Sequence, residues 1–136
     1  MSRIICIDYG GKRTGLAVTD PLKIIATALT TVETKNLISF LKDYFFKEEV
    51  ELILIGEPLN LDDTPTHATP LVHNAIKQLQ KAFPDIPIKT IDERFTSKLA
   101  SQAMIDMGMK KKERRKKENI DQIAAAIMLQ EWLNMQ

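Results

Sequence analysis

Several residue types and patterns are scarce in this sequence, and each scarcity excludes a class of protein. The chain of 136 residues has one cysteine, Cys6, so it cannot form an intramolecular disulfide, and a reducing compartment such as the cytoplasm is expected. Because Cys6 lies inside an apolar run, we expect it to be buried in the core. No apolar stretch approaches the ~20 residues that a membrane-spanning helix needs, so no membrane association is expected.

An excess of charge of one sign is also missing. The 19 Lys and Arg residues against 18 Asp and Glu residues give a formal net charge of +1, which excludes a uniformly basic, histone-like binder but leaves segregated charge open. The N-terminus leads directly into an apolar run, so we expect no signal peptide. The length, with 44% hydrophobic residues, suits one core, and we expect residues 1–136 to form a single domain.

The hydrophobic pattern predicts an α/β fold with a sheet of mixed direction. Short links between the first three apolar runs favour an antiparallel meander, and the continuous apolar run after the first helix favours a buried parallel strand beside the first one. We expect strands at residues 3–8, 14–19, 23–32, 50–55 and 86–92, and helices at 35–47, 70–82, 97–107 and from about 119 to the C-terminus.

Acidic residues follow the strands that are predicted to run parallel. Asp8 closes the first strand, Glu57 follows the fourth, and Asp92 and Glu93 close the fifth. Ligands bind at the carboxyl ends of parallel strands in open α/β sheets, so we expect these acids to converge on one edge.

The last helix offers a further acid, Asp121, for which two interpretations stay open. The basic segment before this helix is long enough to bring the chain back to the acidic edge, where Asp121 would join the cluster. Alternatively, Asp121 only stabilises the start of its helix, because acids are favoured in the first turn.

Clustered carboxylates indicate a divalent metal ion, because like charges at close range otherwise repel. Hard oxygen ligands suit Mg²⁺ or Mn²⁺, and two such ions can activate a water and stabilise the leaving oxygen of a phosphodiester. No His or Cys spacing favours zinc, since His67 and His73 lie six residues apart across a loop–helix junction.

A strongly basic segment precedes the last helix. Seven of the eight residues at 110–117 are Lys or Arg, which describes either a solvated loop or a contact for a polyanion near Asp121. Lys12 and Arg13 add positive charge after Asp8. Aromatic residues make up only 6% of the chain, so stacking on single-stranded bases is expected to be secondary.

These motifs, in this order, resemble the YqgF family of bacterial ribonuclease-H-like proteins. The resemblance covers nearly the whole chain and is carried by the segments Asp8-Tyr9-Gly10-x-Lys12-Arg13-x-Gly15-x-Ala17-x-x-Asp20, Gly56-x-Pro58, Asp92-Glu93-Arg94-x-Thr96-Ser97 and Asp121-x-x-Ala124-Ala125. The family is described as Holliday junction resolvases and as nucleases that process the 5′ end of precursor 16S ribosomal RNA. It implies a five-stranded sheet of order 3-2-1-4-5, with the second strand antiparallel, flanked by helices.

The resemblance also implies roles for individual residues. Asp8, Glu93 and Asp121 would be the catalytic acids that bind Mg²⁺ or Mn²⁺, whereas Asp92 is expected to be structural. Lys12, Arg13 and Arg94 would hold phosphates or orient the acids. From the charge of the basic segment itself, further nucleic-acid contacts are expected at Lys110, Lys111, Lys112, Arg114, Arg115, Lys116 and Lys117.

Two positions weaken the correspondence with the family. Glu57 aligns with a carboxylate of related junction resolvases, but the family pattern leaves that position variable. Asp62-Asp63 replaces the usual Asp/Asn-Gly turn after the Gly-x-Pro motif, which puts the shape of that loop in doubt.

Three functions remain open, and we favour the first. It is a metal-dependent nuclease acting on structured nucleic acid, precursor ribosomal RNA or branched DNA, as a monomer or homodimer. The second is a nucleotide-binding module like the actin-like ATPases, which need two such domains around a cleft. The third is a non-catalytic RNA-binding factor in ribosome assembly.

Overall fold

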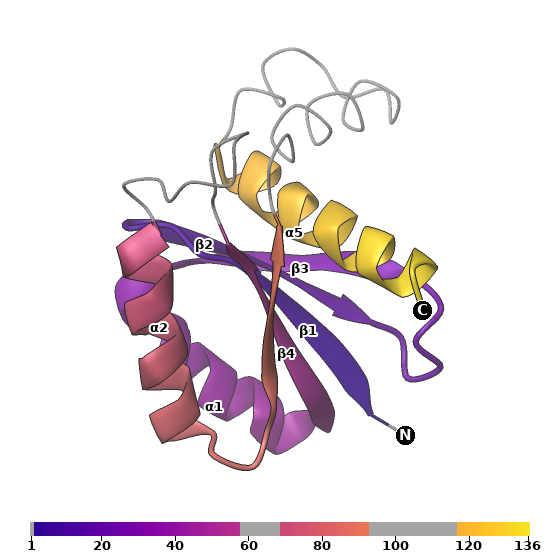
Figure 1. Cartoon of the computed structure of the whole chain (residues 1–136), viewed down its shortest axis with the longest axis horizontal. Helices are drawn as coiled ribbons and strands as arrows, with labels where there is room; N and C mark the ends of the chain where they lie inside the picture. The colour runs from indigo at the N-terminus through magenta and orange to yellow at the C-terminus, as the bar shows by residue number, and fades with distance from the viewer. Residues whose placement is uncertain (1, 58–68, 93–116) are drawn as a thin grey trace.

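The chain folds into one five-stranded sheet with helices on both faces (Figure 1). The computed structural model describes residues 2–57, 69–92 and 117–136. The elements are β1 (Arg3–Asp8), β2 (Arg13–Thr19), β3 (Ala26–Glu33), the 3₁₀ turn η1 (Thr34–Asn36), α1 (Leu37–Lys47), β4 (Val50–Glu57), α2 (Thr69–Ala82), β5 (Ile88–Asp92) and α5 (Lys117–Asn134). No helix in these ranges is both long and apolar enough to cross a membrane.

The sheet confirms the predicted topology. Its order is β3-β2-β1-β4-β5. β1 and β3 both run antiparallel to β2, while β4 runs parallel to β1 and to β5. The carboxyl ends of β1, β4 and β5 therefore meet at the same edge of the sheet, as the sequence predicts.

Strand alternation divides the core into two layers. Ile5 and Ile7 of β1 pack with α1 and α2 on one face, whereas Ile4 and Cys6 pack with α5 on the other. Figure 1 shows this arrangement, with α1 and α2 on one side of the sheet and α5 on the opposite side. Cys6 is fully buried and reduced, as expected. The side chain of every second residue along a central strand therefore belongs to the α5 face.

The start of β3 differs from the prediction. We expected a strand from residue 23, but β3 begins at Ala26 because Asp20 holds the preceding residues in a turn. The Asp20 carboxylate accepts hydrogen bonds from the backbone N–H groups of Ile24 and Ile25, both at 2.8 Å, and of Leu22 at 3.2 Å. These donors, with Ile25 foremost, hold the pKa of Asp20 below its ordinary value. Lys23 has a positive φ of 59°, a conformation that a strand cannot accommodate.

Other boundaries shift by a few residues. The predicted helix from residue 35 begins as the 3₁₀ turn η1 and becomes α1 at Leu37. β4 extends to Glu57, β5 begins at Ile88, and α5 begins at Lys117 rather than near residue 119. The helix predicted at 97–107 and the loop with Asp62-Asp63 lie outside the described residues.

Candidate active site

The candidate site begins with three neighbouring positions on adjacent strands. Asp8 at the end of β1 lies opposite Gly15 of β2, and Gly15 lies opposite Thr31 of β3. Directly opposed residues of antiparallel strands share a face, and Asp8 follows Ile4 and Cys6 on the α5 side by alternation. Asp8 is half-buried. Its carboxylate therefore belongs to the face that α5 covers.

Gly15 allows α5 to lie directly on this face. A Cβ atom at position 15 would overlap the carbonyl group of Asp121 and crowd the backbone N of Gln122. Any side chain at this position would push the helix outward, since backbone atoms cannot give way as a flexible side chain can. Because glycine has no side chain, Asp121 can lie directly above position 15 of β2, next to Asp8.

The position of Asp121 within α5 bears on its two interpretations. The helix begins at Lys117, so Asp121 lies beyond its first turn, where the favourable effect of the helix dipole on acids has largely ended. The Asp121 carboxylate instead accepts a long hydrogen bond from Arg13, with Nε to Oδ2 at 3.4 Å. Side-chain exposures of 33% for Arg13 and 26% for Asp121 make this a partly buried ion pair. The ion pair with Arg13 ties Asp121 to β2.

The turn between β1 and β2 is held by Thr34, which follows β3. The Thr34 hydroxyl donates to the Gly10 carbonyl at 2.5 Å, and the Thr34 backbone N–H donates to the Lys12 carbonyl at 2.9 Å. Because the Thr34 hydrogen is used in this way, the buried Thr14 hydroxyl donates to Thr34 Oγ1, at 2.9 Å. Three hydrogen bonds thus fix the turn that links Asp8 to Arg13.

The turn's glycines have different roles. A Cβ atom at Gly10 would overlap the carbonyl oxygen of Arg13, so the fold itself requires glycine there. A Cβ atom at Gly11 would have no protein atom within 4 Å. Only Gly11 therefore faces open space where another molecule could approach the backbone.

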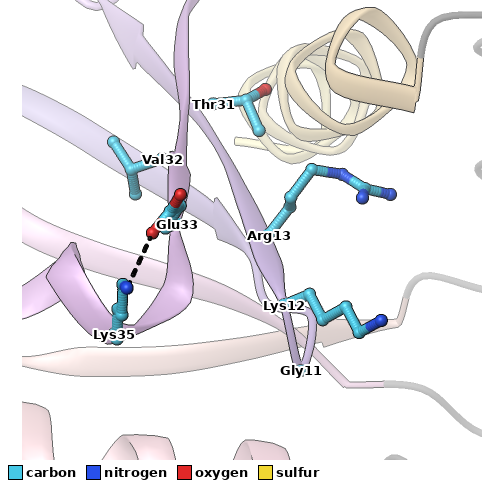
Figure 2. Close-up of a pocket in the computed structure, with 7 residues that line it drawn as sticks. All are labelled: Gly11, Lys12, Arg13, Thr31, Val32, Glu33 and Lys35. Carbon is cyan, nitrogen blue, oxygen red and sulfur yellow. Dashed lines mark ion pairs between the residues drawn. The ribbon is translucent and has the colours of Figure 1, made fainter.

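A surface cavity of about 660 Å³ opens beside this turn. It is lined by residues of the turn and of the end of β3, including Lys12, Arg13 and Lys35. Figure 2 shows Arg13 and Thr31 extending toward the start of α5, and Lys35 paired with Glu33 across 3.3 Å. Lys12 is exposed and has no ion pair among the described residues. The candidate acidic site and a basic cavity thus share Arg13.

Glu57 lies at the predicted edge but faces the other way. Leu52 and Leu54 pack on the α5 face, so alternation assigns Glu57 to the face of α1 and α2. The Glu57 carboxylate lies 3.4 Å from Nε2 of His73 on α2. Its register partner is Asp92 on β5. The structure therefore separates Glu57 from the α5 face that carries Asp8 and Asp121.

Several predicted site residues lie outside the described residues. These are Glu93, Arg94, Lys110, Lys111, Lys112, Arg114, Arg115 and Lys116, together with His67. Lys117 is the first residue of α5, and only its backbone is described. Within the described ranges, no group of three or more His, Cys, Asp or Glu side chains could hold a metal ion.

The sequence alone did not indicate Thr34 or Lys35. Thr34 acts through contacts with Gly10 and Thr14, which are 24 and 20 residues away. The motif that contains Gly10 and Thr14 gives no sign that its turn needs an external partner. A basic residue near the end of β3 could have been noted, but only the fold places Lys35 on the same cavity as Lys12.

Replacing Gly15 by alanine should destabilise the protein by separating α5 from β2. Overpacking against backbone typically costs about 1–3 kcal/mol, so the free energy of unfolding of Gly15→Ala should fall by about this amount in denaturant titration. Gly11→Ala is the matched control, because its Cβ meets open space. Equal stability of the two variants would show that Gly15 does not set the position of the helix.

Replacing Thr34 by valine keeps the shape of the side chain but removes its hydroxyl. The buried Thr14 hydroxyl and the Gly10 carbonyl then lose their partner, at a cost of about 1–3 kcal/mol in unfolding free energy. Thr27→Val on β3 is the control, since Thr27 is exposed and should tolerate the change within about 0.5 kcal/mol. Chemical denaturation of both variants measures the difference. An unchanged free energy of unfolding for Thr34→Val would show that the Thr34 hydroxyl does not stabilise the turn.

Comparisons with known proteins agree with this architecture. A viral resolvase solved with its substrate, "Crystal structure of Fowlpox virus resolvase and substrate Holliday junction DNA complex", has a TM-score of 0.62 at 10% identity and covers 98% of this chain and 97% of that chain. "T. thermophilus RuvC in complex with Holliday junction substrate" has a TM-score of 0.60 at 14% identity, covering 99% and 95%. At such identities the likeness shows the fold, a RuvC-like ribonuclease-H fold.

Sequence comparisons identify the family of the chain as well as its fold. A protein of Christiangramia forsetii named "Putative pre-16S rRNA nuclease" is 55% identical over 133 residues, covering 98% of both chains. A protein of the same name from Flavobacterium psychrophilum is 50% identical over 133 residues, covering 98% of this chain and 97% of the relative. A family model described as "RuvX: Holliday junction resolvase" matches residues 2–135. The chain belongs to the RuvX family, which its motifs indicated under the name YqgF.

Proposed function

We propose that this protein is a divalent-metal-dependent nuclease that processes the 5′ end of precursor 16S ribosomal RNA in the cytoplasm, with residues 1–136 as one nuclease domain. The observation that carries the proposal is the approach of α5 to β2 at Gly15, which brings the backbone of Asp121 over the position beside Asp8. The backbone of Asp121 and the position of Asp8 thus lie on the same face of the sheet, which supports a joint role for the two acids.

The donor set fits Mg²⁺ or Mn²⁺. Both acids offer carboxylate oxygens, the ligands that these hard cations prefer. Glu93 is our proposed third ligand. Ile91 of β5 packs on the α5 face, and Glu93 follows β5 directly in the sequence. A divalent ion held by these carboxylates would supply an activated water and stabilise the leaving oxygen of the phosphodiester.

Basic residues of the chain would bind and orient the substrate. Arg13 holds the Asp121 carboxylate through Nε and can offer its remaining N–H groups to a phosphate. Lys12, exposed in the neighbouring turn, adds a second cation. We propose that Arg94 and the basic residues at 110–117 extend this contact along the nucleic-acid backbone, where neutralised phosphates provide most of the affinity.

Precursor ribosomal RNA is our preferred substrate because relatives about half identical to this chain carry that name over nearly their whole length. A Holliday junction is the second candidate, favoured by the description of the family model. A junction resolvase makes paired cuts and would act as a homodimer, whereas an RNA nuclease can act as a monomer. Both candidates use the same acids on a backbone phosphate.

Replacing Asp8 or Asp121 by asparagine should abolish cleavage and leave the fold intact. Each change removes a charged ligand and with it several kcal/mol of transition-state stabilisation, which corresponds to a loss of rate of about 100-fold or more. Cleavage of precursor 16S RNA and of a four-way DNA junction should be measured with Mn²⁺ and with EDTA, and EDTA should stop the wild-type reaction. Asp43→Asn, an exposed change on α1, is the control.

The outcomes separate the remaining functions. If Asp8→Asn cuts as fast as wild type, the site assignment is wrong. If wild type binds RNA in EDTA, with salt-sensitive affinity, but yields no product with Mn²⁺, the protein is a non-catalytic RNA-binding factor. Cleavage of the junction alone would make DNA the substrate.

A further inference from the structure

The basic cavity beside the turn that links β1 and β2 is not explained by the acidic site. Its walls carry three cationic side chains, Lys12, Arg13 and Lys35, against one acidic side chain, Glu33. Glu33 is paired with Lys35 and Arg13 is paired with Asp121, so Lys12 is the lining cation whose charge no described ion pair compensates. An anionic ligand would balance this excess.

Arg13 is shared by the cavity and the candidate active site. The Arg13 guanidinium contacts Asp121 at 3.4 Å, and the same residue lines the cavity. Figure 2 shows Arg13 directed toward α5, while Lys12 and Lys35 lie further from the helix. A polymer bound at Asp8 and Asp121 that continued past Arg13 would enter this cavity.

The cavity is large enough to take a short segment of nucleic-acid backbone. Its volume of about 660 Å³ falls within the ~300–1,000 Å³ typical of small-ligand sites. No protein atom lies within 4 Å of a Cβ built on Gly11, so the floor of the turn is open. Val32 adds an apolar surface to the lining, against which a sugar can pack.

We propose that this cavity is a subsite for the substrate strand beyond the cleaved phosphate, and that Lys35 is a further substrate-binding residue that contacts a flanking phosphate. The inference rests on the proposed nuclease function, because that function brings the strand to Asp8. The Glu33–Lys35 pair does not oppose it: their side chains are 64% and 79% exposed, and such exposed pairs are held weakly. Lys35 can therefore exchange Glu33 for a phosphate at little cost.

The test compares Lys35→Gln with Lys47→Gln in binding to a labelled RNA duplex that carries a single-stranded 5′ extension. Lys47 is exposed at the far end of α1 and serves as the matched control. Loss of one phosphate contact should reduce the slope of log Kd against log salt concentration by about 0.7–0.9 for Lys35→Gln. KM for cleavage should rise and kcat should stay near the wild-type value, because Lys35 does not touch the reacting atoms.

The Glu33→Gln variant is an independent test, for which the opposite change in RNA affinity is expected. Removing this acid frees Lys35 and lowers the negative charge in the cavity, so the variant should bind the same RNA more tightly than wild type. Wild-type affinity or weaker affinity for Glu33→Gln contradicts the subsite.

The results distinguish failure of the subsite from failure of the proposed function. If Lys35→Gln and Lys47→Gln share the wild-type salt slope while wild type still cleaves RNA, the subsite is wrong and the nuclease stands. If wild type binds RNA with the predicted dependence on Lys35 but never cleaves it, the cavity binds RNA as proposed and the nuclease function is wrong. A wild-type protein that does not bind the RNA overturns both.

Discussion

The contact between Gly15 and the backbone of Asp121 is the constraint on which the site depends. The helix α5 crosses the sheet at this point because β2 presents no side chain there. The register of β1 and β2 then places Asp8 beside the crossing point. Arg13 precedes Gly15 by two residues on β2, and its side chain contacts Asp121. Moving the helix outward by the width of a methyl group would alter all of these relations together, because packed cores do not deform gradually.

The sequence predicted most of the fold because its hydrophobic periods are clear. The continuous apolar runs of β1 and β4 indicated central strands, and short links predicted the meander. Prediction failed where a side chain competes with regular structure. Asp20 binds three backbone N–H groups and delays β3 to Ala26. Hydrogen bonds of this kind, from a side chain to nearby backbone groups, override strand propensity. The spacing of apolar residues gives no indication of them.

The sequence was less informative about the site. It predicted that acids would gather at one edge, but it treated Glu57 as a possible member, although alternation from Leu52 and Leu54 assigns Glu57 to the opposite face. It left Asp121 undecided because it placed the start of the last helix near residue 119, which puts Asp121 in the first turn, whereas α5 begins at Lys117. Thr34 could not have been found, since its partners are distant in the chain. Such tertiary contacts leave no local pattern.

Paramagnetic broadening of backbone amide signals by Mn²⁺ tests the central claim most directly, because it reports metal binding without requiring substrate or turnover. If Asp8 and Asp121 hold the metal, the first signals to broaden on adding substoichiometric Mn²⁺ should be those of Asp8, Gly15 and Asp121, and Asp121→Asn should abolish the effect. Broadening centred instead on Glu57 and His73, at the opposite face, or broadening that survives Asp121→Asn, would contradict the account.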